Sequence, residues 1–219
     1  MTPQEIEMII RGIGETLYMT VAATLFGYVI GLPWGIVLTV TGKDGIHPNR
    51  ALYRTLDAVT NIMRSIPFLI LLILVLPITL FIVGKTYGST ATIVPLVISA
   101  APLIARMVES SLNEVDHGVI EAAQSMGANN TQIVLRVLLG EARISLISGA
   151  TITTGTILGY SAMAGTVGGG GLGDIAIRYG YYRYQANILW VTVILLIILV
   201  QIFQYTGNLI SLKLDRRKV

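Results

Sequence analysis

Cysteine is absent from the 219 residues, which excludes disulfide bonds, cysteine-ligated zinc sites, iron–sulfur clusters and thiol catalysis. Charge is also scarce: Asp, Glu, Lys and Arg make up 12% of the chain, about half of the share in soluble domains. Apolar residues make up 53%, and the mean hydropathy is +0.73. This composition indicates a membrane protein. The net charge of +3 is too small to indicate nucleic-acid binding.

Nucleotide-binding motifs are missing too. No GxxxxGK[ST] element occurs, so this chain does not hydrolyse ATP with a P-loop. The run 168–173 formally matches GxGxxG, but it follows an apolar stretch instead of a β-strand, which argues against a dinucleotide site. We interpret this run as a turned segment at which buried backbone can bend and line a cavity.

Five apolar stretches predict an all-α polytopic membrane protein with a single domain over residues 1–219, since a helical span needs about 20 residues. The predicted spans are residues 16–40, 65–83, 91–105, 145–164 and 188–210. They contain no Asp, Glu, Lys, Arg or His, and His47 and His117 fall in predicted loops. An intramembrane enzyme or a proton-coupled carrier would therefore lack its usual groups, and we expect no metal or cofactor in this chain. Glu5, Glu7 and Glu15 surround a single Arg11, unlike a secretory signal, so we expect the N-terminus to be retained.

The distribution of basic residues predicts the orientation in the membrane. Eleven of the 15 Lys and Arg lie on one side of the predicted spans. They are Lys43, Arg50, Arg54, Arg64, Arg106, Arg136, Arg143, Lys213, Arg216, Arg217 and Lys218, against Arg11, Lys85, Arg178 and Arg183 on the other side. Because basic loops are retained in the cytoplasm, we expect the N-terminus outside and the C-terminus in the cytoplasm.

The longest inside connection, residues 106–143, has the pattern of two short helices. Asp116 can cap the first, which Gly127 would end, and Asn130 can cap the second, over residues 131–139. Apolar residues at helical spacing in the first helix form a small face, made of Val119, Ala122, Ala123 and Met126. This face either packs on the protein's own spans or docks a partner.

Small residues recur at a spacing of four in three places, which allows helices to approach closely. The sets are Gly27, Gly31 and Gly35; Gly155 and Gly159; Gly165 and Gly169. Spacing alone does not decide between packing within one subunit and packing between subunits. Five prolines, Pro33, Pro67, Pro77, Pro95 and Pro102, interrupt the predicted spans and suggest that broken helices line a pathway.

One segment of the inside connection carries a resemblance. Glu121-Ala122-Ala123, followed after three residues by Gly127-Ala128, resembles the EAA loop of permease subunits of ATP-binding-cassette (ABC) importers. Residues 61–68, 101–109 and 159–165 are similar to the methionine-uptake permeases of that superfamily. One departure is Gly140, which follows Leu139 where the family usually has Pro, and we expect a similar turn there with looser geometry.

This resemblance implies a type I ABC importer permease fold in a bacterial inner membrane. It implies a homodimer of five-span subunits, two cytoplasmic ATPase subunits that bind ATP and Mg, and an extracytoplasmic substrate-binding protein or lipoprotein that delivers methionine. The EAA helix would sit in a groove on the ATPase and drive alternating access. Glu121 would make a charge-assisted contact or hold the loop backbone, Ala122 and Ala123 would allow close approach, and Gly127 would set the turn before Ala128.

The resemblance also suggests positions on the translocation path. Plausible wall or gate residues are Ser65, Pro67, Pro102, Tyr160, Ser161 and Met163, each of which could equally be core. Met163 could close a constriction at the two-fold axis. Three alternatives stay open: an ABC permease for another amino acid or small solute, an ion-coupled secondary carrier, and an intramembrane hydrolase.

Overall fold

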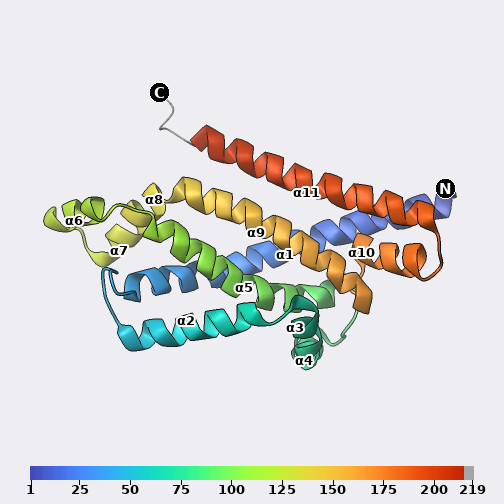
Figure 1. Cartoon of the computed structure of the whole chain (residues 1–219), viewed down its shortest axis with the longest axis horizontal. Helices are drawn as coiled ribbons and strands as arrows, with labels where there is room; N and C mark the ends of the chain where they lie inside the picture. The colour runs from blue at the N-terminus through green and yellow to red at the C-terminus, as the bar shows by residue number, and fades with distance from the viewer. Residues whose placement is uncertain (215–219) are drawn as a thin grey trace.

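The computed structural model describes residues 1–214, and all regular structure in that range is helical. Helices α1, α2, α5, α9 and α11 run along the long axis of the molecule (Figure 1). The N-terminus and α10 lie toward one end, and α6 lies at the other. The elements are α1 (Pro3–Thr41), α2 (Arg50–Ser65), α3 (Phe68–Leu74), α4 (Leu76–Val83), α5 (Ser89–Asn113), α6 (His117–Ser125), α7 (Asn130–Gln132), the π-helix Ile133–Leu138, α8 (Leu139–Glu141), α9 (Arg143–Ala164), a 3-10 turn Gly165–Val167, α10 (Gly171–Ile175), the π-helix Ala176–Tyr181 and α11 (Ala186–Leu214).

Three helices of the described chain, α1, α5 and α11, are long and apolar enough to cross a membrane, and α2 with α3 can count as a fourth, broken span. They contain the predicted spans 16–40, 91–105 and 188–210. The predicted span 145–164 is helix α9, whose hydroxyl side chains lower its hydropathy although they bond to carbonyls of the same helix. Five spans therefore stay a prediction. The basic residues Arg216, Arg217 and Lys218, used to predict orientation, lie outside the described residues.

The predicted second span, residues 65–83, is wrong as a continuous helix. Residues 50–65, expected to be mainly a loop, form α2, whose N-cap Asn49 accepts a hydrogen bond from the Leu52 N–H at 3.1 Å. Proline at 67 forces Ile66 into an extended conformation, with φ −80° and ψ 122°, so α2 ends there and α3 leaves at 103° to it. A second break at Val75 separates α3 from α4. Pro77 lies in the first turn of α4, and Pro33, Pro95 and Pro102 lie inside α1 and α5 without ending them.

The glycine stripe of α1 packs within the subunit, against α5. A Cβ atom added at Gly31 would lie 2.7 Å from the carbonyl oxygen of Ala101, and one at Gly35 would lie 2.6 Å from that of Ala105. The two backbones can be this close only because both positions lack a side chain. Gly159 differs, because a Cβ there would meet nothing within 4 Å.

The glycine-rich run 168–173 is a packed turn that leads into α10, as the sequence predicts for a turn between the last two predicted spans. Gly168, Gly170 and Gly171 have positive φ, which glycine tolerates best. The first N–H groups of α10 are bound by α1: that of Gly171 donates to Glu15 Oε2 at 2.8 Å, and that of Leu172 donates to Thr16 Oγ1 at 2.9 Å. These two bonds hold the start of α10 against α1, at the end of the subunit opposite to α6 (Figure 1).

Candidate coupling loop and transport path

The candidate coupling helix, α6, begins and ends where the sequence predicts. Asp116 caps it, since its Oδ1 accepts a hydrogen bond from the Gly118 N–H at 2.7 Å. Gly127, with φ +81°, ends it: its N–H donates to the carbonyl of Gln124 at 2.9 Å, and the N–H of Ala128 donates to the carbonyl of Ala123 at 3.0 Å. The capping geometry of both ends is therefore confirmed.

The small apolar face of α6 divides between the core and the surface. Ala123 is 6% exposed and belongs to the core, against which Ala128 packs. Val119 and Met126 are 41% and 83% exposed. Glu121 and Ala122 are exposed as well, and the hydrogen bonds found in residues 1–214 do not include one from the Glu121 side chain to the loop backbone. One side of α6 thus packs on the rest of the subunit, while Val119, Glu121, Ala122 and Met126 are exposed.

The second helix of the loop differs from its prediction at both ends. Its cap is Asn129 instead of Asn130, because Asn129 and Gln132 form a reciprocal capping box with two bonds of 2.9 Å. The expected turn at Gly140 is wrong: the helix continues through it to Glu141 and breaks only at Ala142. Glycine, unlike proline, keeps its N–H and does not clash with the preceding turn, so it allows this continuation.

Four of the six predicted path residues are at least partly exposed, and two are buried. Ser65 and Pro67 are exposed at the bend after α2, and Met163 is 49% exposed near the end of α9. Tyr160 is partly buried, with its ring stacked on Phe68 at a centroid distance of 4.6 Å, which connects the α2–α3 bend to α9. Pro102 and Ser161 are instead buried inside the subunit, and Ser161 Oγ donates to the carbonyl of Leu158 at 2.7 Å.

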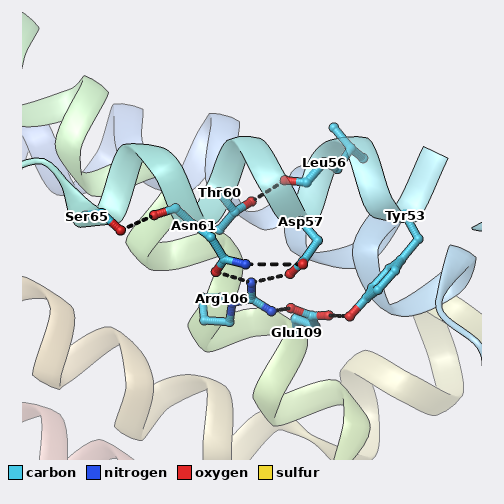
Figure 2. Close-up of polar contacts among 8 residues, drawn as sticks. All are labelled: Tyr53, Leu56, Asp57, Thr60, Asn61, Ser65, Arg106 and Glu109. Carbon is cyan, nitrogen blue, oxygen red and sulfur yellow. Dashed lines mark hydrogen bonds and ion pairs between the residues drawn. The ribbon is translucent and has the colours of Figure 1, made fainter. Parts of the chain in front are cut away.

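A polar cluster between α2 and α5 is the feature that the sequence does not predict (Figure 2). Tyr53, Asp57 and Asn61 lie four residues apart on α2, and their side chains meet Arg106 and Glu109 of α5. This spacing is the available signal, since it places all three on one helix face. The sequence predicts a loop over most of residues 41–64, and in a loop this spacing would not bring the three side chains together.

Two hollows lie at the opposite ends of the subunit. A cavity of about 330 Å³ lies beside α6 and includes Glu109, His117 and Ile120 in its walls. The second hollow, of about 440 Å³, is bordered by Glu15 and Asp174. Burial raises the pKa of the Asp174 carboxyl above its usual value, and the ion pair with Arg178 offsets part of this rise. Among residues 1–214, no group of three or more His, Asp or Glu could hold a metal ion.

Known proteins are similar to this chain over most of its length. The probable D-methionine transport system permease protein MetI of Vibrio cholerae is 50% identical over 211 residues, which cover 96% of this chain and 94% of that protein. The D-methionine transport system permease protein MetI of Escherichia coli K12 is 53% identical over 158 residues, or 72% of this chain and 73% of that protein.

Solved structures agree with these relatives. A chain from a structure described as inward-facing conformations of the MetNI methionine ABC transporter has a TM-score of 0.97 and 49% identity, and covers 99% of this chain and 100% of its own. A chain of an amino acid ABC transporter, at 20% identity and TM-score 0.73, shares the fold. The fold is that of a type I ABC importer permease. Residues 16–218 also match the family model of the binding-protein-dependent transport system inner membrane component, and the chain belongs to that family.

Proposed function

We propose that this chain is the membrane subunit of an ATP-driven importer that moves methionine across the bacterial inner membrane by alternating access. The observation that carries this proposal is the 50% identity to a D-methionine permease over 96% of the chain. The chain has no P-loop, so ATP and Mg bind to a separate ATPase subunit. We assign the whole chain, residues 1–219, to one domain with five spans, the N-terminus outside and the C-terminus in the cytoplasm.

The assembly in this proposal contains two copies of this chain, two cytoplasmic ATPase subunits and an extracytoplasmic binding protein or lipoprotein. The exposed side of α6, with Glu121, Ala122 and Met126, contacts the ATPase. Its other side is fixed through Ala123 and Ala128 to the core, which supports movement of α6 together with the inner ends of the spans.

The path in this proposal runs along the α2–α3 bend and the outer half of α9. Ser65, Pro67 and Met163 supply exposed surface there, and Tyr160 sets the distance between the two elements through its stack on Phe68. Pro102 and Ser161 are buried behind the wall of this path and support it. Met163 closes the constriction, because its flexible apolar side chain is half exposed on a glycine-containing helix.

Two other functions that the sequence alone allows are an ABC permease for another amino acid or small solute and an ion-coupled secondary carrier. Uptake of labelled methionine by cells that express the chain with its genomic partners separates them, with and without ATP depletion. We expect saturable, ATP-dependent uptake. Uptake that survives ATP depletion but stops when the ion gradient collapses would support the carrier instead.

The coupling loop is tested in the same cells with Gly127→Asp. Because φ at Gly127 is +81°, a side chain there strains the end of α6, and we expect uptake to be lost while the protein stays in the membrane. The matched control is Gly140→Asp, which adds the same charge at a helical position with nothing within 4 Å of a new Cβ. Equal uptake by the two variants would contradict the assignment of α6.

A further inference from the structure

Helix α2 has little apolar attachment to the rest of the subunit. Thr60 is the single buried residue of its 16, and Leu52, Val59 and Ile62 are 40% exposed or more. The side of α2 that faces α5 carries a polar stripe, made of Tyr53, Asp57 and Asn61 (Figure 2). The position of α2 on α5 therefore depends on polar contacts more than on apolar burial.

Arg106 is the centre of these contacts. Its Nη2 donates to Asp57 Oδ1 at 2.5 Å and to Asn61 Oδ1 at 2.8 Å, so one nitrogen holds two residues of α2. Its Nη1 donates to Glu109 Oε2 at 2.6 Å, and Tyr53 of α2 donates to the other oxygen of Glu109 at 3.2 Å. The planar guanidinium can reach both helices at once, which a lysine ammonium on a flexible stem does less well.

The cluster lies between the two parts of the subunit that the proposed function requires to move together. Towards the cytoplasm, α5 ends at Asn113, shortly before the cap of α6. Towards the path, α2 ends at the Pro67 bend, beyond which Phe68 stacks on Tyr160. Helix α3, beyond the bend, packs on α5 directly, whereas a displacement of α6 that moves α5 reaches the α2 side of the bend through this cluster.

We propose that Arg106 is a positioning residue for transport: it locks α2 to α5, so that the coupling movement of α6 is transmitted to the bend at Pro67. This inference rests on the proposed function. The competing explanation is that Arg106 only neutralises Glu109, whose side chain is 5% exposed and whose carboxylate would otherwise be buried without a cation.

The two explanations separate in a pair of variants. Arg106→Met removes both the lock and the counter-charge of Glu109, so both explanations expect a damaged protein. Arg106→Met combined with Glu109→Gln removes the buried charge as well, while the carbonyl oxygen of the new amide can still accept a hydrogen bond from Tyr53. Simple neutralisation predicts that the double variant regains wild-type transport. If Arg106 locks α2 to α5, the double variant instead regains stability, but its transport stays poorly coupled to ATP hydrolysis.

The readout is methionine transported per ATP hydrolysed, measured on the purified transporter with its ATPase in proteoliposomes. For the double variant we expect this ratio to fall by about 5-fold or more, the lower end of ordinary coupling between two sites, with ATPase activity retained. Arg106→Lys should lie between it and wild type. The control is Arg54→Met, the same change at an exposed position of α2 whose side chain forms no ion pair among residues 1–214.

A distance measurement tests the lock independently of transport. Because the chain has no cysteine, Thr55→Cys on α2 and Ser110→Cys on α5, both exposed, allow two spin labels to be attached to it specifically. We expect the double variant to broaden the α2–α5 distance distribution. An unchanged width together with an unchanged transport ratio would overturn the inference. Absence of methionine transport in the wild type would overturn the proposed function instead, and the width would still decide whether Arg106 holds α2.

Discussion

Replacing Gly31 by alanine should destabilise the subunit, although alanine favours helix. The added Cβ would lie 2.7 Å from the Ala101 carbonyl oxygen and 2.7 Å from Ile104 Cβ, where ordinary contacts begin at 3.4 Å. The first of these is a backbone atom, so a side-chain rotation cannot relieve the clash. Helices α1 and α5 must therefore move apart by about 0.7 Å, which forfeits roughly a quarter to a half of the dispersion energy of each contact between them.

The expected loss of stability is the difference between two opposing contributions. Overpacking of this kind costs about 1–3 kcal/mol, and the higher helix propensity of alanine returns about 1 kcal/mol at most. With the full gain, the difference is a net loss of about 0–2 kcal/mol. Because the clash is with a backbone atom, we expect Gly31→Ala to fall in the upper half of this range, about 1–2 kcal/mol. Gly35→Ala, with a Cβ 2.6 Å from the Ala105 carbonyl oxygen, should lose at least as much.

The assay is thermal denaturation of the purified protein in detergent, followed as the loss of the monodisperse peak in size-exclusion chromatography. Gly14→Ala is the matched control, since Gly14 lies on the same helix and its Cβ would meet nothing within 4 Å. This control should be as stable as wild type or slightly more so. A Gly31→Ala protein as stable as the Gly14→Ala protein would refute the close packing of α1 on α5.

Two further variants test the proposed path and the contact between α1 and α10. Met163→Ala should raise the basal leak of methionine or uncouple the ATPase, because it shortens the proposed gate; unchanged leak, uptake and basal ATPase would show that Met163 only packs. Thr16→Val should cost about 1–3 kcal/mol in the same thermal assay, because it leaves the buried N–H of Leu172 without its acceptor. It should also speed hydrogen exchange at Leu172, and unchanged exchange would count against the role of Thr16.

Features that are set by a short segment of the chain, such as apolar helices and helix ends, could be predicted from the sequence. The apolar runs located α1, α5 and α11 because hydropathy is a property of a continuous segment. Asp116 and Gly127 set the ends of α6 by their own side chain and backbone. Even the incorrect cap at Asn130 was one residue away, and the capping box with Gln132 decides in favour of Asn129.

Features that depend on distant partners could not be predicted in the same way. The glycine spacing in α1 predicted a close approach, but only the structure identifies α5 as the helix that approaches. Helix α2 is polar enough to resemble a loop in the sequence. The role of its polar side chains is clear only once Arg106, 49 residues after Asp57, is seen to bond to them. The break at Pro67 is predictable, because the residue before a proline avoids the helical conformation. The angle of 103° between α2 and α3 depends instead on what α3 packs against.

ATP-driven methionine accumulation in proteoliposomes tests the central claim most directly. The vesicles would contain the purified chain with its ATPase and binding protein, and no ion gradient. We predict that labelled methionine accumulates when ATP is supplied to the ATPase side and not when a non-hydrolysable analogue replaces it. Accumulation that needs an ion gradient and ignores ATP, or ATP-driven accumulation of another solute but not of methionine, would contradict the account.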